Sequence, residues 1–244
     1  MIETRPQRGA QADHILLDTL YVEIHEESEP IVIAPYEAML AALNAVPWDR
    51  APEVIPIRPL DRANIDFFPG HRGFVGPKFP HRDGVMVVGN NFSSVSGWKD
   101  YCKSPDLQSE IATWRKLRVI IHASGLGIER FWFTNYCHGV MERNSESYRF
   151  PKSVVTSLEF DELFAKCVRV MRPVLIVSLG KLASDLLGTD YKHREKIERR
   201  KIAGHSTKLI AAVHPSAWTW AKRGFSIEDF KSEGERIRAA FQAP

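Results

Sequence analysis

The chain has 244 residues, 44% of them apolar and 26% charged, and its net charge is +3. This ordinary apolar content excludes a chain that is disordered throughout, and the small net charge does not by itself predict a polyanionic partner. No apolar run approaches the length of a membrane-spanning helix, about 18 residues, and the first residues lack the apolar core of a secretion signal. We therefore expect a cytoplasmic protein without a membrane partner.

The cysteines and histidines show no metal-binding spacing. Cys102, Cys137 and Cys167 are scattered and odd in number, and no CxxC pair is present. This usage is typical of reduced thiols in a cytosolic protein and does not indicate a disulfide framework or a zinc ribbon. The histidines form no HxH, HxxxH or HxxE pattern. We expect no metal and no other cofactor.

The N-terminal third differs from the rest of the chain. Residues 10–47 predict two amphipathic helices, and residues 48–82 are rich in proline, glycine and arginine, which is typical of a long surface loop. We expect residues 1–83 to form a helical extension and loop packed on a core of residues 84–244, the whole being one structural domain.

From residue 84 onward, apolar runs of strand length alternate with segments of helical periodicity. The predicted strands cover 85–88, 131–134, 174–179 and 209–213, and the predicted helices cover 106–124, 159–171, 181–187 and 226–242. This alternation predicts a three-layer α/β/α fold with a central, mostly parallel, four-stranded sheet. In open sheets of this kind ligands bind outside the carboxyl ends of the strands. The predicted strands lead into residues 89–92, 135–138, 180–181 and 214–216, where polar groups serve as ligand contacts or as helix caps.

Four segments together resemble motifs of a known enzyme family. Residues 87–92 (VVGNNF) are similar to a strand followed by a glycine and a water-positioning residue, and residues 133–135 (FTN) to a strand that ends in a base-reading asparagine. Residues 172–183 (RPVLIVSLGKLA) match a proline, apolar strand, Leu-Gly and alanine signature, and residues 213–216 (VHPS) match a His-Pro-Ser loop. In this order, they resemble the uracil-DNA glycosylase superfamily over about residues 84–220.

The first motif departs from the usual family pattern. Phe92 stands where the family usually has proline, and Asn91 stands where many members have a carboxylate, as in the mismatch-specific branch. Residues 93–98 lack the tyrosine that closes a strict uracil pocket. The three cysteines also fall short of the four ligands of the iron–sulfur branches. The resemblance therefore implies a glycosylase without a cluster that removes uracil or a modified base, including a hypermodified base of phage DNA.

Each motif would have its own role in base excision. Asn91 would hold the attacking water by its carbonyl oxygen, and His214 would donate a hydrogen bond to the base as negative charge develops. Asn135 would read a pyrimidine edge, and Gly89 and Asn90 would line the same substrate pocket. The structural alternatives are a turn cap for Asn91, backbone hydrogen bonding for Asn135 and an inert loop position for His214. The other histidines, His138 among them, stand in no comparable context.

Aromatic side chains are expected to contact the flipped base and the DNA stack. Phe92, Trp98 and Tyr101 are candidates for stacking on the base, and Trp98 is preferred because it follows Gly97, although core packing is the competing role. Trp218 lies four residues after His214, where the family places an apolar wedge in the duplex.

Basic residues bracket the loop that contains His214. They lie at 192–201, including Arg199 and Arg200, and again at Lys222 and Arg223. Together with Ser216 and Trp218 they are expected to follow the phosphates of single- or double-stranded DNA, the alternative being a solvated face. The protein is expected to act as a monomer.

The sequence thus predicts a monofunctional DNA glycosylase, because no lysine stands at a clear Schiff-base position. Two other readings stay open. One is a catalytically weak or inactive DNA-binding relative, since Asn91 cannot ionise. The other is an unrelated nucleotide-binding α/β protein, although the glycine-rich phosphate loops that it would need are absent.

Overall fold

The computed structural model describes residues 38, 41–57, 82–91, 94–103, 112–141, 149–215 and 226–244. Their central feature is a five-stranded sheet in the order β3-β2-β5-β7-β6. Its strands are β2 (Val85–Gly89), β3 (Phe131–Asn135), β5 (Leu175–Leu179), β6 (Glu198–Ile202) and β7 (His205–Ala212). The first four strands of that order pair in parallel, and only β6 is antiparallel.

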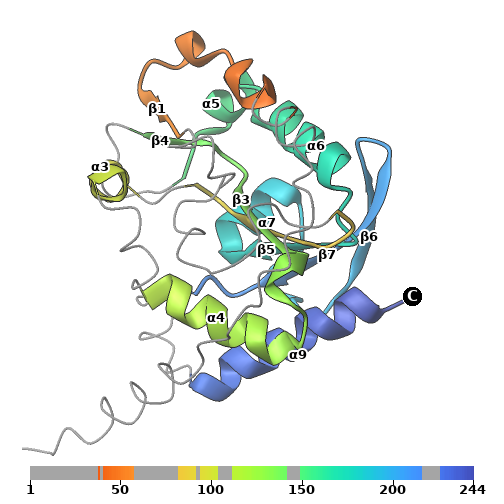
Figure 1. Cartoon of the computed structure of the whole chain (residues 1–244). Coiled ribbons are helices and arrows are strands. Elements are labelled where there is room, and N and C mark those ends of the chain that lie inside the picture. The colour runs from red at the N-terminus through yellow and green to blue at the C-terminus, as the bar shows by residue number, and fades with distance from the viewer. Residues whose placement is uncertain are drawn as a thin grey trace, which may run out of the picture.

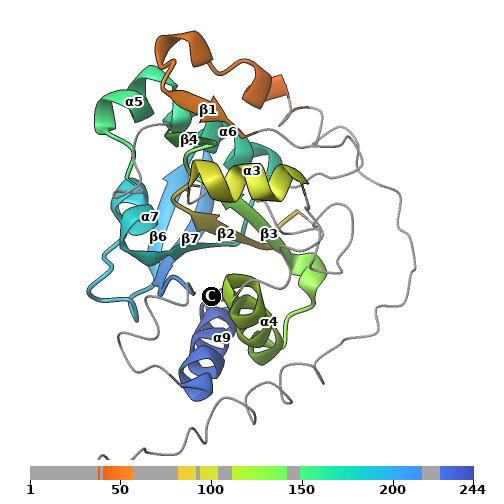
Figure 2. The same cartoon turned by 90° about the vertical axis from the view of Figure 1, so that its left-hand side faces the viewer.

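Helices cover both faces of this sheet, as the alternation of apolar segments predicts. Figures 1 and 2 show α4 (Ala112–Ser124) and α9 (Ile227–Gln242) side by side on one face, with α5 (Lys152–Ser157) and α6 (Phe160–Met171) on the other. The chain is therefore a mixed α/β protein with a mostly parallel sheet. None of the helices in the described ranges combines the length and the apolar character needed to cross a bilayer.

The central strands are buried on both faces, so alternate side chains enter two separate cores. Val85 and Val87 of β2 pack with Trp114, Phe133 and Ile237 on the side of α4 and α9. Met86 and Val88 of the same strand face the opposite core. That second core contains Phe160, Leu163 and Val168 of α6, together with Leu43 and Val54 from the N-terminal third. Apolar burial on both faces explains why these strands are continuous hydrophobic runs.

The predicted number of four strands was wrong. The fifth strand, β6, has the sequence ERRKI and joins β7 through a two-residue turn, since Ile202 pairs with His205. Its charged residues carry no apolar signal because it lies at the sheet edge, where charged side chains also discourage pairing with other chains. Through this hairpin, β7 begins at His205, four residues earlier than predicted.

Several short elements complete the fold. They are η1 (Trp48–Arg50), η4 (Ile128–Arg130), α3 (Val95–Lys103), α7 (Gly180–Leu187), β1 (Val54–Pro56) and β4 (Gly139–Met141). The last two form a separate antiparallel pair. The segment after the first motif is largely the helix α3. The expected helices over residues 10–37 and most of the proline-rich loop lie outside the described residues.

Candidate functional site

The four predicted strand ends lie next to one another at one edge of the sheet. Gly89 at the end of β2 is in register with Asn135 at the end of β3. Leu179 at the end of β5 is in register with Ala212 at the end of β7, two residues before His214. Because all four strands are parallel, their carboxyl ends share one edge. This edge is where ligands bind in open α/β sheets.

The two asparagines after β2 are joined to each other and to the neighbouring segment. The amide of Asn90 donates to the side-chain oxygen of Asn91 over 2.7 Å. The backbone N–H groups of Tyr136 and Cys137 donate to the carbonyls of Gly89 and Asn90, each over 2.9 Å. The first two motifs therefore stay paired beyond the ends of their strands. Asn91 is partly exposed, and its carbonyl oxygen keeps a second lone pair for another donor.

Asn135 has a polar atom without a partner. Only 2% of the residue is exposed, and its buried side-chain oxygen has no hydrogen-bond partner among the described residues. A buried carbonyl left unpaired costs about 1–3 kcal/mol. A bound ligand that presents an N–H group would supply the missing donor.

His138 lies beneath this segment and was missed by the sequence reasoning. It is only 2% exposed, its Nε2 lies 3.3 Å from the hydroxyl of Thr134, and it hydrogen-bonds to the backbone of Asn135. Burial lowers the pKa of His138 to about 4, and the hydrogen bond to Asn135 opposes that shift. The imidazole is therefore neutral at pH 7. No local signal in the sequence marked it, because its segment is held by backbone hydrogen bonds to distant residues, with Tyr136 and Cys137 bonded to Gly89 and Asn90 and His138 bonded to Ile57.

His214 follows β7 and packs against the start of α7. Gly180 has φ of +79°, and a Cβ atom added to it would lie 2.8 Å from the Cβ of His214. Desolvation lowers the pKa of His214 to about 4, although the residue keeps some solvent exposure. At neutral pH its ring is an uncharged imidazole with one N–H donor.

Trp98 packs in a small apolar cluster. It is 8% exposed and contacts Ile57 and Val140 within this cluster. In this structure Trp98 is therefore a core-packing residue, which was the competing role. Stacking on a base would require its ring to leave the cluster. Phe92 lies outside the described residues, as do the predicted DNA contacts Ser216, Trp218, Lys222 and Arg223. The side chain of Tyr101 is not described either.

Arg199 and Arg200 lie on β6, away from the candidate edge. Arg199 is in register with Lys208, which stands six residues before His214 and therefore about 20 Å from it along the strand. Arg200 donates to the carbonyls of Leu187 and Gly188, at 2.5 and 2.6 Å, and so caps the end of α7. The antiparallel turn of the chain carries both residues away from His214, although they are near it in sequence.

The described residues include no group of three or more histidine, cysteine or acidic side chains that could hold a metal ion. Cys137 and Cys167 are free and buried. Burial raises the pKa of the Cys137 thiol, and it raises that of Cys167 to about 12. Both thiols therefore stay protonated and behave as apolar core groups.

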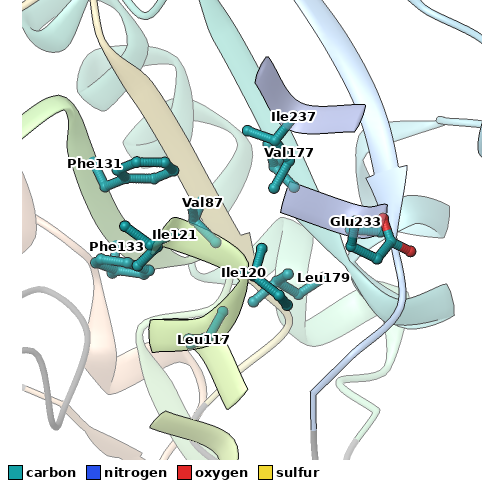
Figure 3. A pocket seen from close by; sticks show the side chains of 11 residues that line it. Val87, Leu117, Ile120, Ile121, Phe131, Phe133, Val177, Leu179, Glu233 and Ile237 are labelled. Atoms are coloured by element: carbon teal, nitrogen blue, oxygen red, sulfur yellow. The ribbon is translucent and has the colours of Figure 1, made fainter. Parts of the chain in front are cut away.

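A small cavity lies between the sheet and the helices α4 and α9. Figure 3 shows that its walls are almost entirely apolar, with Glu233 the one charged side chain among them. The other lining residues are Val87, Leu117, Ile120, Ile121, Phe131, Phe133, Val177, Leu179, Ala212 and Ile237. Since it lacks converging polar groups, we interpret it as a packing defect of the core.

The chain matches no family model and no curated protein.

Proposed function

We propose that the protein is a DNA glycosylase that flips uracil or a modified base out of DNA and hydrolyses its N-glycosidic bond. The observation that carries the proposal is the shared edge of Asn91, Asn135 and His214. Asn135 is the last residue of β3, Asn91 and His214 follow β2 and β7 by two residues each, and these three strands run parallel in one sheet. Their residue types and order along the chain match the motifs of the uracil-DNA glycosylase superfamily that the sequence resembles.

The reaction requires a held base, a positioned water and a stabilised leaving group. Water attacks C1′ of the deoxyribose as the bond from C1′ to the base nitrogen breaks, and the sugar becomes oxocarbenium-like. The bond electrons leave on the base, and a proton from the water returns the base to its neutral form. Asn91 would accept a hydrogen bond from the water but cannot remove its proton, so slower chemistry is expected than with a carboxylate.

His214 is suited to stabilise the departing base. Its low pKa keeps the ring neutral, so its single N–H would donate to the base carbonyl oxygen as negative charge builds. A neutral donor is already present before the charge develops and needs no prior protonation. The loss of this donor is expected to slow base release by about 10²–10³-fold.

Asn135 supports the choice of a nucleobase as the ligand. Its buried, unpaired carbonyl oxygen would accept the N–H of a uracil-like ring. Rotation of the amide by half a turn exchanges the acceptor for a donor, which would instead match the edge of a cytosine-like base.

The test is alkaline cleavage of end-labelled oligonucleotides that each carry one candidate base. The bases are uracil, hypoxanthine, thymine opposite guanine, and 5-hydroxymethyl- or glucosylated cytosine. We expect the wild type to produce abasic sites at one of them, and Asn91→Ala, Asn135→Ala and His214→Ala to lose that activity. Asn44→Ala and His122→Ala change exposed residues of the same types and should cleave like the wild type. Cleavage that survives all three site substitutions would contradict the assigned roles.

A catalytically weak DNA-binding relative is the second candidate. It is favoured by Asn91, which cannot ionise and whose carbonyl already accepts a hydrogen bond from Asn90. Salt-sensitive DNA binding without abasic sites at any tested base would favour this candidate over the glycosylase. Absence of both binding and cleavage would reject both.

A further inference from the structure

The strand that leads to His214 extends beyond its neighbours. On one side, the pairing of β7 with β6 ends where Glu198 meets Leu209. On the other side, the pairing with β5 ends at Ala212. In a strand, backbone groups of alternate residues point to the same side, so those of Ala211 and Val213 point to the side that β6 has left. Without other partners, this last part of β7 would have unpaired backbone groups directly before His214.

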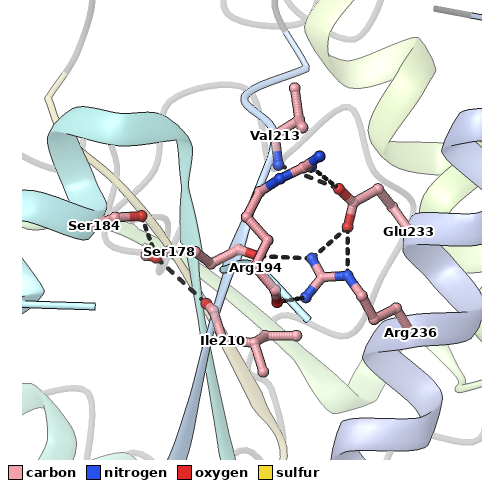
Figure 4. Close-up of polar contacts among 8 residues, drawn as sticks. Ser178, Ser184, Arg194, Ile210, Val213, Glu233 and Arg236 are labelled. Atoms are coloured by element: carbon pink, nitrogen blue, oxygen red, sulfur yellow. Dashed lines mark hydrogen bonds and ion pairs between the residues drawn. The ribbon is translucent and has the colours of Figure 1, made fainter. Parts of the chain in front are cut away.

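Two side chains from α9 take the place of the missing strand. Arg236 donates from Nη2 to the carbonyl of Ala211 over 2.6 Å, and the N–H of Val213 donates to Oε1 of Glu233 over 3.4 Å. Figure 4 shows both side chains reaching from the helix to the end of the strand. They therefore continue the backbone pairing for two more residues after β6 has ended.

The same two side chains belong to a closed network. Arg236 donates to Glu233 through Nε and Nη2 and to the carbonyl of Arg194 over 2.5 Å. Arg194 returns a hydrogen bond of 2.7 Å to Glu233, which is only 7% exposed. A buried carboxylate with two guanidinium partners has little freedom to move, because any displacement leaves a charge unpaired.

We infer that Glu233 and Arg236 are positioning residues that set where the chain leaves β7 and thereby hold His214 at the sheet edge. Val213 is bonded to Glu233 and is the residue directly before His214. On its other flank, His214 contacts Gly180 at the start of α7. The network thus restrains the histidine from the side of α9, while Gly180 limits its approach to the sheet. The inference rests on the proposed function only in one respect, the role of His214 in base release.

A network that served stability alone would behave differently. Well-packed apolar side chains often stabilise a core as well as a buried ion network does. A gain in stability therefore does not by itself explain why these positions carry charged side chains. A merely structural network, when weakened, lowers the melting temperature and leaves the rate per folded molecule unchanged. A positioning network instead changes the surroundings of His214 and the rate of base release, with little effect on DNA binding.

Two conservative variants test this difference in the full-length protein. Glu233→Gln keeps the shape of the side chain and removes its charge. Arg236→Lys keeps the charge and removes the planar fork that contacts three groups. Each has a matched control on an exposed part of α9, namely Glu228→Gln and Arg238→Lys. Each variant is compared with its control by NMR and by single-turnover cleavage of the preferred oligonucleotide.

The first readout does not depend on enzyme activity. We expect Glu233→Gln and Arg236→Lys to shift the Val213 amide and His214 ring resonances, while both controls keep the wild-type spectrum in this region. The single-turnover rate should fall by about 10–100-fold with oligonucleotide affinity within about twofold of wild type, since small displacements of a catalytic group are costly. Lower melting temperatures with wild-type His214 resonances and rates would overturn the inference. If the wild type cleaves no base, the proposed function fails, and the resonances alone decide whether the network positions His214. If Glu233→Gln does not fold, Arg236→Lys supplies the same comparison.

Discussion

Gly180 and His214 are so close that the first has no room for a side chain. A Cβ on Gly180 would lie 2.8 Å from the Cβ of His214, and its φ of +79° is one that glycine adopts readily and other residues do not. This contact joins the third motif to the fourth, so the glycine of the Leu-Gly signature sets how closely the histidine approaches the sheet.

Gly180→Ala is therefore expected to reduce both stability and base release. The positive φ alone costs about 1–2 kcal/mol, and the clash should add to that and displace His214. Gly204→Ala is the control, because Gly204 has φ of +85° and an added Cβ would meet nothing within 4 Å. Urea unfolding and single-turnover cleavage should show a similar backbone cost in both variants and loss of activity only in Gly180→Ala. Equal activities would mean that this contact does not position His214.

Stability is expected to fall as the pH drops from about 6.5 to about 4. His138 and His214 have a pKa of about 4 in the folded protein against 6.5 in the unfolded chain, so the unfolded chain binds more protons in this interval. For the buried His138, this difference in pKa corresponds to about 3 kcal/mol. Urea unfolding at pH 7.5 and at pH 5 should show a smaller loss for His138→Gln than for the wild type. The exposed His122→Gln should match the wild type, and equal losses in all three proteins would reject this origin of the pH dependence.

The turn between β6 and β7 offers a stabilising substitution. Ala203 and Gly204 have φ of +49° and +85°, the signs of a type I′ turn, for which Asn-Gly is the preferred pair. We expect Ala203→Asn to raise the free energy of unfolding by about 0.5–1 kcal/mol, because asparagine tolerates the left-handed region better than alanine. Thermal denaturation measures the effect. Ala239→Asn, on the exposed side of α9, should instead be slightly destabilising.

Lys208 ties the last helix to the sheet. Its Nζ donates to the carbonyls of Phe241 and Ala243, each over 2.7 Å, at the end of α9. Lys208→Met should keep most of the apolar packing and lose about 1–2 kcal/mol, since charged groups make the stronger hydrogen bonds to helix ends. Lys201→Met, at an exposed position of β6, should change stability little. If the two variants unfold at the same urea concentration, the cap contributes nothing to stability.

Local signals in the sequence were enough to predict the elements of the sheet core. The run at 85–88 is apolar throughout, and the run at 131–134 is apolar except for Thr134, because both faces of these strands are buried. Such runs need no tertiary information to be found. The positions of Gly89 and Asn135 at strand ends follow from the same runs. The prediction that these strand ends share one edge of the sheet also follows, because parallel strands have their carboxyl ends at the same edge.

The tertiary structure alone decided the relationships that depend on pairing between distant segments. β6 is a strand because its hairpin turn brings ERRKI beside β7, and this pairing removes Arg199 and Arg200 from the vicinity of His214. His138 is buried in a segment whose backbone is bonded to residues 89–90 and to Ile57, although nothing in its own residue type required burial. Glu233 meets Val213 because α9 packs where β6 has ended. Each of these contacts depends on the lengths and registers of several elements at once, and no local pattern of residues contains that information.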